Sequence, residues 1–335
     1  MTRPTIVIAH MEGLRPFDDA ALDRLDAAGR LLDRDPIHSW NGDRADALLA
    51  EAEIIVGHWG TPGINAAMLA RAPKLQMFAY AAGTVKWAME PDAWERDLVV
   101  TSGAAANAEP VAEYTLAMIL LANKRVFPAI DQMRGHGGWT PPEGTAPHGN
   151  WDKTIGLVSA SLIGRRVAEL LQPFPHLPVE VFDPFVDAAE IEALGATKAD
   201  DLIELCRKAD VLSIHAPALP ATHNLIAAEH LAALPDGATV INNSRGHCLD
   251  LGALVAELES GRLFAIIDVT DPLEPLPDDH PLRTLPNAIY TPHIAGSQGT
   301  ELERMAYWVC DEVERFVEGR PQRNQITHDM IDRIA

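Results

Sequence analysis

Hydrophobic and polar residues alternate regularly over the second half of the chain. Short runs of β-branched residues are separated by longer stretches rich in Ala, Leu and Glu. The short runs have the length and composition of buried strands, and the longer stretches are typical of helices. Strands that alternate with helices form a parallel sheet with helices on both faces. The strands predicted here are 154–158, 179–182, 211–215, 239–241, 264–268 and 288–290.

The first part of the chain repeats this pattern more loosely. Its strand candidates are again short apolar runs bounded by turn residues and by helix-like stretches. We therefore predict that the chain forms two Rossmann-like α/β domains, with doubly wound parallel sheets and a cleft between them. The strands predicted in this part are 5–9, 53–56, 75–79 and 98–101.

The segment 111–125 is expected to mark the boundary between the domains. It is apolar on nearly every face at its centre, as a helix buried between packed layers is. The segment 134–150 is rich in Gly, Pro and His and is predicted to be a long loop that is functional or makes a subunit contact. A helix at 301–319 would return to the first domain. The expected domains are 1–107 plus 298–335, and 108–297.

Composition and charge narrow the classes of partner. Hydrophobic residues make up 47% of the chain and the net charge is −21. This charge disfavours nucleic acid and anionic membranes, which are themselves negative. The longest apolar run, 116–122, is too short to cross a membrane. His10 and Glu12 interrupt the first apolar run, so we expect a strand there and no secretory signal.

The cysteines predict a reducing environment. Only three are present, and they are too scattered for a disulfide framework or a zinc site. We therefore expect a cytoplasmic protein without a structural metal.

The segment between the strand 154–158 and a predicted helix at 162–171 is a candidate dinucleotide-binding turn. Such a turn normally has the pattern G-x-G-x-x-G, but here only Gly164 remains, with Ser159 and Ser161 at the other two glycine positions. On its own this turn would be a purely structural connection. Serine is nevertheless small and can donate to a phosphate oxygen, so Ser161, Leu162 and Ile163 are predicted to contact a cofactor.

Asp183 strengthens the cofactor interpretation. It ends the next strand, 19 residues after Gly164, where an acidic residue accepts hydrogen bonds from the ribose of a dinucleotide. A carboxylate would repel a 2′-phosphate, which favours NAD over NADP. The alternative is that Asp183 only starts a turn before Pro184.

Three polar blocks follow successive strands of the second half. They are Asn-Asn-Ser-Arg-Gly at 242–246, Asp-Val-Thr-Asp-Pro-Leu-Glu-Pro at 268–275 and Thr-Pro-His-Ile-Ala-Gly at 291–296. Open α/β sheets bind ligands at the carboxyl ends of their strands. Each block alone is an ordinary loop with an arginine, an acid or a histidine. Their order together favours a catalytic site.

With these blocks the chain resembles the D-isomer-specific 2-hydroxyacid dehydrogenase family, over roughly residues 75–320. Further matches are Asn107 before Val-Ala-Glu at 111–113, His-Ala-Pro at 215–217 and the helix-like segment 252–261. The resemblance implies an NAD-dependent oxidoreductase that interconverts a small D-2-hydroxy acid and its 2-oxo acid. It also implies a homodimer, with an NAD-binding domain at 108–297 and a flavodoxin-like substrate-binding domain in the remainder. The segment 134–151 is where we expect the dimer contact.

The resemblance also implies catalytic roles. His293 would be the general acid and base, Arg245 would hold the substrate carboxylate and polarise its carbonyl, and Glu274 would orient the imidazole. In the family pattern the acid falls five residues after the strand-ending Asp268, a position that Leu273 occupies here. Glu274 lies one residue later, so Asp271 is an alternative partner for His293.

Further contacts are implied residue by residue. For the substrate they are Ala82 and Gly83, in a loop at 80–83, and Asn107. The loop at 58–61 lacks the arginine expected for a phosphorylated substrate, which favours a non-phosphorylated acid. Trp59 and Trp87 are candidates for an apolar wall. The implied cofactor contacts, besides Asp183 and the turn at 161–163, are His215, Ala216, Pro217, Thr222, Ser244, Asp268 and Ala295.

Two other functions stay open. The two serines and the displaced Glu274 would suit an NAD-sensing, corepressor-like protein with little turnover. A formate-type dehydrogenase on the same fold needs no proton transfer, and its relatives carry an amide where an acid partners the histidine. A glutamate near that position favours hydroxy acids.

Overall fold

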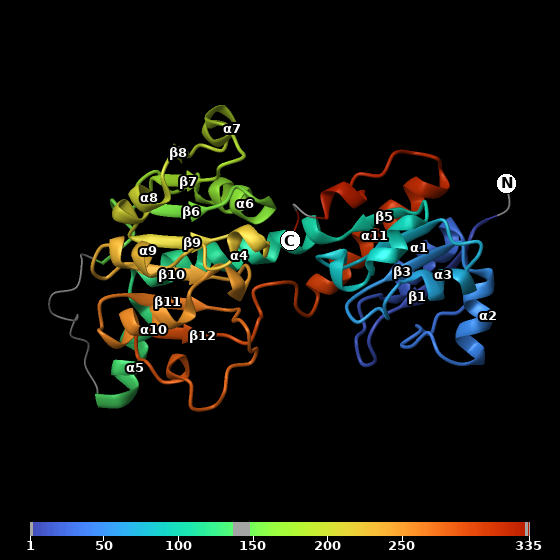
Figure 1. The fold of residues 1–335 in the computed structure, drawn as a ribbon, viewed down its shortest axis with the longest axis horizontal. Helices are drawn as coiled ribbons and strands as arrows, with labels where there is room; N and C mark the ends of the chain where they lie inside the picture. Colours follow the sequence, from blue (N-terminus) through green and yellow to red (C-terminus); the bar gives the residue numbers. More distant parts are fainter. Residues whose placement is uncertain (1–2, 137–147, 332–333, 335) are drawn as a thin grey trace. The chain divides into compact units, whose positions relative to one another are not determined.

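The computed structural model describes residues 3–136, 148–331 and 334. The chain divides into two compact units, Met1–Asn107 with Ser297–Ala335 (unit 1) and Ala108–Gly296 (unit 2). Each unit contains a parallel sheet with helices packed on it (Figure 1). The predicted α/β class with two parallel sheets is confirmed.

Unit 1 has a five-stranded sheet of order β2-β1-β3-β4-β5. Every neighbouring pair in this sheet is parallel. Its strands are β1 (Thr5–Ala9), β2 (Arg30–Leu31), β3 (Ile54–Gly57), β4 (Met77–Tyr80) and β5 (Val99–Ser102). Its helices are α1 (Asp19–Ala28), α2 (Asp43–Glu51), α3 (Ala66–Arg71) and α11 (Glu301–Val317), with short 3-10 turns at Val85–Trp87, Pro91–Glu95 and His328–Met330.

Helices cover both faces of this sheet. Leu49 of α2 and Met68 of α3 pack on one face, where the core includes Phe78. Leu25 of α1 and Val309 of α11 pack on the other face. The continuous apolar runs of the strands follow from this burial on both sides.

Unit 2 has a seven-stranded sheet of order β12-β11-β10-β9-β6-β7-β8, again parallel throughout. Its strands are β6 (Ile155–Val158), β7 (Val179–Phe182), β8 (Thr197–Ala199), β9 (Val211–Ile214), β10 (Thr239–Asn242), β11 (Phe264–Ile267) and β12 (Ala288–Tyr290). Its helices are α4 (Ala104–Asn123, which begins in unit 1), α5 (Val126–His136), α6 (Leu162–Leu171), α7 (Ala188–Ala193), α8 (Leu202–Lys208), α9 (Ala228–Ala233) and α10 (Leu251–Glu259), with 3-10 turns at Pro220–Thr222, Gly246–Cys248 and Pro281–Arg283.

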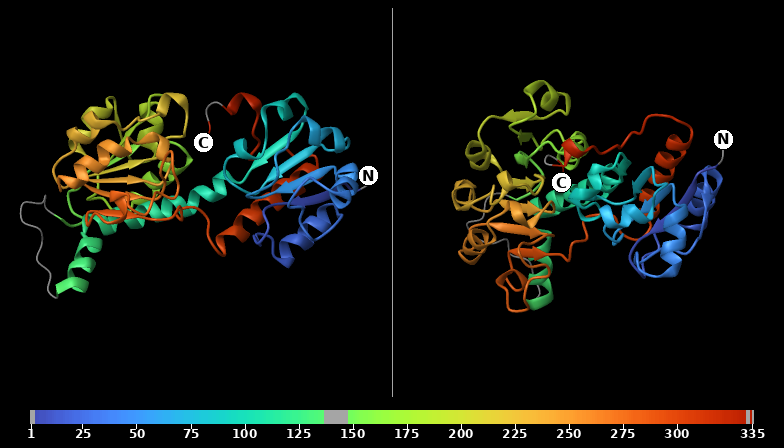
Figure 2. Two further views of the ribbon diagram at one scale, coloured as in Figure 1. Left: turned by 60° about the horizontal axis from the view of Figure 1, so that its bottom comes forward. Right: turned by 45° about the vertical axis from the view of Figure 1, so that its right-hand side comes forward.

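The strand order of unit 2 reverses between β6 and β9. The chain runs outward from β6 through β7 to β8, then returns to β9 and continues outward on the other side. Helices α8, α9 and α10 cover one face of the sheet, while α4 and α6 cover the other (Figure 2). Loops at the carboxyl ends of β6 and β9 therefore flank the switch point at which such sheets bind ligands.

Helix α6 packs closely on the turn that precedes it. Its buried residues, Gly164, Val167, Ala168 and Leu171, recur at the spacing of one helix face. A Cβ at Gly164 would lie 2.1 Å from the carbonyl oxygen of Ser159. Only glycine fits at this position.

Two short edge strands escape prediction from the sequence. β2 and β8 have two and three residues and lack a buried apolar run. Helix α4 begins at Ala104, earlier than the predicted 111, and includes Pro110. The predicted loop at 134–150 begins inside α5, and its residues 137–147, which include much of the expected subunit contact, lie outside the described part of the chain.

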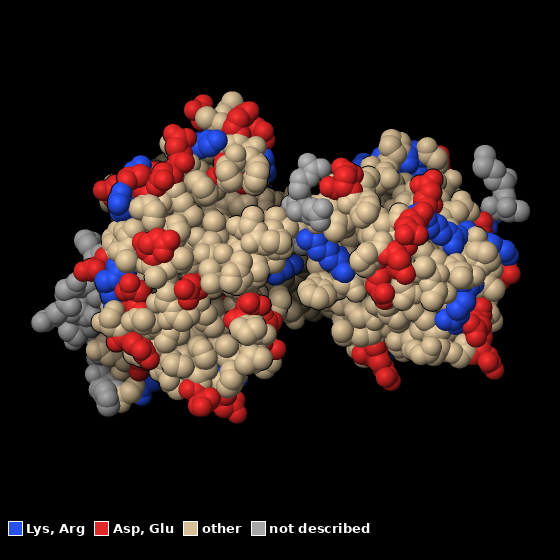
Figure 3. Space-filling view, in the orientation of Figure 1, with Lys and Arg blue, Asp and Glu red and all other residues tan. Residues whose placement is uncertain are grey.

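Many of the charged side chains lie on the surface. Acidic side chains are scattered over the visible face of each unit, with basic side chains among them (Figure 3). Over the residues that the structure describes, no helix is both long and apolar enough to cross a membrane.

Replacement of Gly164 by Ala is expected to destabilise unit 2 by about 1–3 kcal/mol, because the new methyl group overlaps the Ser159 carbonyl. Urea unfolding measures the effect. Gly252→Ala is the matched control, since its nearest contact would be an ordinary 3.5 Å. In helix α10 that change should stabilise by about 0.5–1 kcal/mol. Equal stability of the two variants would contradict the close packing.

Candidate active site

His293 and Glu274 form a hydrogen-bonded pair beyond the carboxyl ends of β12 and β11. Nδ1 of His293 lies 2.5 Å from Oε1 of Glu274, and the other carboxylate oxygen accepts from the N–H of Thr270 at 3.2 Å. The side chain of His293 is 52% exposed. The contact with Glu274 leaves Nε2 as the ring nitrogen that can meet a ligand.

Asp271, the alternative partner, makes no hydrogen bond or ion pair with His293 among the described residues. Its backbone lies against the turn that carries Arg245, since a Cβ at Gly246 would be 2.4 Å from the Asp271 nitrogen and 2.1 Å from the Thr270 carbonyl carbon. The one-residue displacement of Glu274 in the sequence therefore still leaves its carboxylate on His293.

Arg245 is half-buried and has no carboxylate within ion-pair distance among the described residues. Its Nη1 donates to its neighbour's carbonyl, on Ser244, at 2.7 Å. Burial lowers the pKa of Arg245 from its usual value, while Cys248 and Glu274 act in the opposite direction. A guanidinium remains charged in proteins, so this group can bind a carboxylate.

The turn that carries Arg245 is closed by Asn242. The Asn242 side-chain oxygen accepts from both the N–H and the hydroxyl of Ser244, and its Nδ2 donates to the carbonyl of Arg245 at 3.0 Å. Ser244 is buried, and its hydroxyl is committed to this turn. These bonds fix the backbone from which the Arg245 side chain extends.

Asp268 holds the loop that carries His293. Its Oδ1 accepts from the Thr291 hydroxyl at 2.6 Å and from the N–H of Ile294 at 2.8 Å. Its Oδ2 accepts from the N–H of Ala295 at 2.9 Å. Asp268 is 1% exposed. Asp268 and Ala295, which the family resemblance assigns to the cofactor site, are hydrogen-bonded to each other.

The dinucleotide-type turn contains a strained serine. Ser159 has a φ of +83°, a conformation that glycine adopts freely and other residues adopt at a cost of about 1–2 kcal/mol. Its hydroxyl donates to Oδ2 of Asp183 at 3.2 Å, and the N–H of Ala160 donates to the same oxygen at 2.9 Å. The N–H of Phe185 donates to Oδ1. Asp183 is 6% exposed. Its carboxylate binds the turn after β6 through Ser159 and Ala160. The bond from Phe185 also closes the turn that Asp183 starts, as the alternative interpretation of this residue expected.

The first turn of α6 offers donors for a phosphate. Ser161 caps the helix by accepting from the N–H of Gly164 at 3.3 Å. The N–H groups of Leu162 and Ile163 have no acceptor among the described residues, as is usual at the start of a helix. Free N–H groups at a helix N-terminus bind anions. This end of α6, with Asp183 after the next strand, fits a pyrophosphate and the adjoining ribose.

Several side chains of the loop after β9 are buried or hydrogen-bonded within the protein. The His215 ring is buried, with Nε2 on the Ser213 hydroxyl at 3.0 Å and Nδ1 without a partner among the described residues. Burial lowers the pKa of His215 to about 3. Thr222 closes the following turn by donating to the carbonyl of Pro217, and Ala216 is buried. The side chains of His215 and Ala216 are thus shielded from solvent, whereas Pro217 and Thr222 are partly exposed.

The substrate residues predicted in unit 1 lie close together. A Cβ on Gly83 would be 3.9 Å from Nδ2 of Asn107. Ser102 donates to the carbonyls of Ala82 and Gly83. The N–H groups of Ala82 and Gly83 have no acceptor within the described chain. Ala82 is fully buried, whereas Gly83 is partly exposed. Asn107 also accepts from the N–H of Ser297 at 3.0 Å.

The loop after β3 carries no cation. Burial lowers the pKa of His58 to about 3, so its ring is neutral. Trp59 is partly buried, whereas Trp87 is 84% exposed and does not line an apolar wall within unit 1. Lys86 donates to the carbonyl of Ile334.

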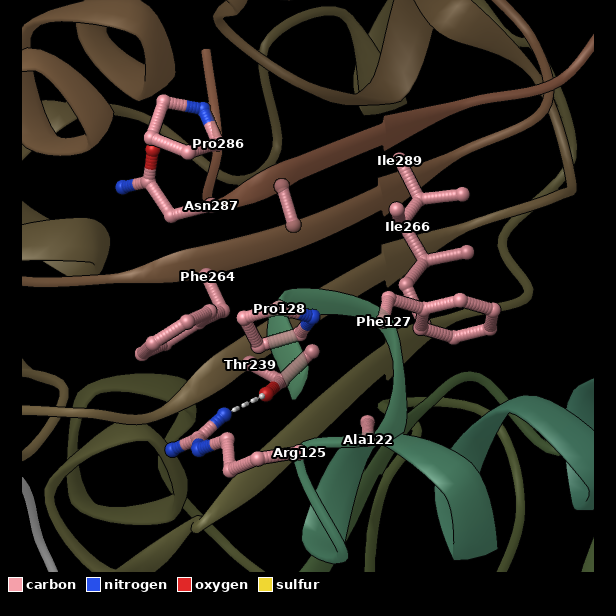
Figure 4. A pocket seen from close by; sticks show the side chains of 11 residues that line it. Ala122, Arg125, Phe127, Pro128, Thr239, Phe264, Ile266, Pro286, Asn287 and Ile289 are labelled. Carbon is pink, nitrogen blue, oxygen red and sulfur yellow. Dashed lines mark hydrogen bonds between the residues drawn. The ribbon is translucent and has the colours of Figure 1, made fainter. Parts of the chain in front are cut away.

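An apolar cavity of about 20 Å³ lies elsewhere in unit 2, at the amino ends of β10 and β11 (Figure 4). Arg125 lines it, stacked 3.8 Å from the centre of the Phe264 ring and hydrogen-bonded to Thr239. The cavity has room for about one water molecule. The cavity lies at the amino ends of the strands, whereas His293 follows the carboxyl end of β12. It is therefore separate from the site.

The fold and these strand ends define unit 2 as a dinucleotide-binding α/β domain. The family model described as "D-isomer specific 2-hydroxyacid dehydrogenase, NAD binding domain" matches residues 116–295. Glyoxylate reductase of Aeropyrum pernix is 30% identical over 277 residues, covering 81% of this chain and 82% of the relative. The chain therefore belongs to the D-isomer-specific 2-hydroxyacid dehydrogenase family and contains its NAD-binding domain.

Other relatives differ in length. D-3-phosphoglycerate dehydrogenase of Methanocaldococcus jannaschii is 27% identical over 281 residues, which are 83% of this chain and 52% of the relative. The chain thus spans about half the length of that relative. The solved structure of the TT0316 protein from Thermus thermophilus is 31% identical, with a TM-score of 0.76, covering 96% of this chain and 100% of that one.

Loss of the Ser159 hydroxyl is expected to tighten NADH binding. In Ser159→Ala the Oδ2 atom of Asp183 has one donor fewer, and this oxygen can accept from a ribose hydroxyl instead. One such hydrogen bond corresponds to an about fivefold lower Kd, measured by NADH fluorescence. Ser159→Gly should do the same and also relieve the strain. Weaker binding in Ser159→Ala would show that the hydroxyl serves the cofactor directly.

His215 is expected to make folding sensitive to acid. Since its folded pKa is about 3, the unfolded chain takes up a proton below about pH 6.5 that the folded chain does not. Stability is therefore present above pH 6.5 and is lost as the pH falls. Between pH 7.5 and 5.5 the wild type should lose about 1.4 kcal/mol more than His215→Gln in urea unfolding. Equal losses would contradict a neutral buried ring.

Proposed function

We propose that the protein is an NAD-dependent dehydrogenase that interconverts a small, non-phosphorylated D-2-hydroxy acid and its 2-oxo acid. The observation that carries the proposal is the set of side chains at neighbouring strand ends of unit 2. It comprises a histidine held by a carboxylate at 2.5 Å and a guanidinium without a carboxylate partner in the described chain. An exposed proton carrier beside an unpaired cation suits a substrate that has both a carboxylate and a carbonyl.

The residues divide the reaction between them. Arg245 binds the substrate carboxylate and polarises the neighbouring carbonyl. His293 gives the proton on Nε2 to the carbonyl oxygen, and takes it back in the oxidative direction, while Glu274 holds Nδ1 and fixes the ring. Bound NADH supplies the hydride. In unit 1, the N–H groups of Ala82 and Gly83 and the side chain of Asn107 are proposed to bind substrate.

The choice of cofactor rests on the acidic end of β7. The N-terminus of α6 would hold the pyrophosphate with the N–H groups of Leu162 and Ile163, and Asp183 would take the ribose hydroxyls. A carboxylate at this position disfavours the 2′-phosphate of NADPH. The strain at Ser159 and the donors already on Asp183 predict weaker NADH binding than an all-glycine turn gives.

We infer the substrate class from the charge of the groups in unit 1. His58 is uncharged, and Lys86 donates to a backbone carbonyl. A phosphorylated acid would need a cation that the 58–61 loop does not provide. The 2-oxo acid is therefore proposed to carry an uncharged side chain.

The first alternative function is an NAD sensor without turnover. The serine-substituted turn favours it, but the intact contact between His293 and Glu274 speaks for catalysis. The second alternative is formate oxidation. Formate oxidation has no proton to transfer, so a carboxylate on the histidine has no use there.

We further propose that the protein forms a homodimer and that it works in a reducing compartment. The exposed face of α5 carries apolar side chains that a second copy would cover, among them Ile130 and Met133 at 40% and 54% exposure. All three cysteines are buried free thiols, which suits the cytoplasm.

The proposal is tested by titrating the protein with NADH and NADPH and then following nicotinamide absorbance with a panel of 2-oxo acids. The panel contains glyoxylate, pyruvate, hydroxypyruvate, bulkier acids and one phosphorylated acid. NADH binding with turnover of a non-phosphorylated acid is expected. Binding without turnover of any acid would favour the sensor, and oxidation of formate alone would favour the second alternative.

His293→Ala is expected to lower kcat for carbonyl reduction by about 10²–10⁴-fold, because it removes the general acid. NADH affinity should stay close to that of the wild type, since the ring is not in the dinucleotide turn. The control is His176→Ala, at an exposed position in unit 2 after α6, which should leave kcat unchanged. Wild-type turnover in His293→Ala would overturn the mechanism.

A further inference from the structure

Three side chains from separate elements of unit 2 form a chain of hydrogen bonds next to His293. The hydroxyl of Tyr114, on α4, lies 3.0 Å from Oγ1 of Thr291, just after β12. Thr291 Oγ1 in turn lies 2.6 Å from Oδ1 of Asp268, just after β11. Residues far apart in the sequence thus meet at one end of the sheet.

The direction of these bonds is fixed by the carboxylate. An ionised carboxylate only accepts, so the Thr291 hydroxyl must donate its proton to Asp268. The Tyr114 hydroxyl must then be the donor to Thr291. Burial and the nearby Asp268 raise the pKa of Tyr114, which keeps its phenol protonated. The chain runs from Tyr114 through Thr291 to Asp268.

Asp268 links this chain to the backbone of the catalytic loop. Its main-chain carbonyl accepts from the N–H of His293 at 3.0 Å, and its carboxylate accepts from the next two N–H groups, of Ile294 and Ala295. His293 itself has a φ of +55°, a conformation that is uncommon for a residue other than glycine and that needs surrounding contacts to persist. Asp268 therefore holds the backbone from which the His293 imidazole extends, while Glu274 holds the ring itself.

Helix α4 is fixed at the same end of the sheet. The hydroxyl of Thr115, beside Tyr114, is fully buried and accepts from Nδ2 of Asn243 at 2.6 Å, just after β10. Tyr114 therefore extends from a helix that is anchored to the neighbouring strand end.

We propose that Tyr114 is a positioning residue for His293 and acts through Thr291 and Asp268. This role rests on the proposed function, in which His293 carries the proton. In this role Tyr114 acts through its bond to Thr291 and not by contact with the substrate or the reacting atoms. It restricts the Asp268 carboxylate to the orientation that holds His293 in its left-handed conformation.

Tyr114→Phe removes only the donor at the start of the chain. Its kcat is expected to fall about fivefold, the rate equivalent of one hydrogen bond, while the KM for the 2-oxo acid and the Kd for NADH change less than twofold. A purely structural role would lower the unfolding temperature and leave kcat unchanged, and that result would overturn the proposal.

A double-mutant cycle with Thr291→Val tests the path. This change removes the link between Tyr114 and Asp268, so adding Tyr114→Phe to it should have no further effect on kcat. Thr291→Ser keeps the hydroxyl and should retain most of kcat. Multiplicative losses in the double variant would show that Tyr114 does not act through Thr291.

Tyr307→Phe is the matched control. Tyr307 is also half-buried and donates to a carboxylate, that of Asp18 at 2.6 Å, but it lies in unit 1. Its loss should leave kcat unchanged. A fall in kcat equal to that of Tyr114→Phe would contradict a specific link.

Hydrogen exchange separates this proposal from the proposed function. Tyr114→Phe should speed exchange of the Ile294 and Ala295 amides, which Asp268 binds, whereas Tyr307→Phe should not. Faster exchange in a protein that reduces no 2-oxo acid would refute the dehydrogenase and retain the positioning role. Unchanged exchange with normal kcat would refute the positioning role alone.

Discussion

The buried carboxylate of Asp268 is the constraint on which the site of unit 2 depends. It is almost fully shielded from solvent and has no cation partner among the described residues, so hydroxyl and backbone N–H donors must stabilise its charge. Those donors come from the loop that carries His293. The requirement to solvate one buried charge thus fixes the backbone of His293, the proposed proton carrier, and a shift of that loop would take donors away from the charge.

The remaining parts of the site are held by close backbone contacts. Gly246 allows the turn with Arg245 to lie directly against Thr270 and Asp271. The same stretch of β11 loop supplies Glu274, whose second oxygen is bound by the Thr270 N–H. Arg245, Glu274 and His293 are therefore all positioned by contacts with one backbone segment, residues 268–274. This explains how Glu274 reaches His293 although it lies one residue beyond the position in the family pattern.

The sequence predicted most of the fold and the identity of the clustered residues. Hydrophobic runs revealed ten of the twelve strands that the structure describes, and the exceptions, β2 and β8, are edge strands without a buried run. Backbone conformation was not predictable. The residue types of the 159–164 turn do not indicate that Ser159 adopts a φ of +83° and donates to Asp183. Tyr114 was missed because on a nearly all-apolar helix it looks like packing.

The site combines an exposed reactive pair with a buried support. His293 and Glu274 are 52% and 34% exposed, which gives a substrate access but makes their mutual attraction weak in water. Such a pair cannot by itself hold an imidazole in a strained backbone conformation. The buried bonds of Asp268 can, because water does not compete for them and because leaving the carboxylate without its donors would be costly. The position of His293, the proposed proton carrier, therefore depends on buried groups more than on the exposed pair.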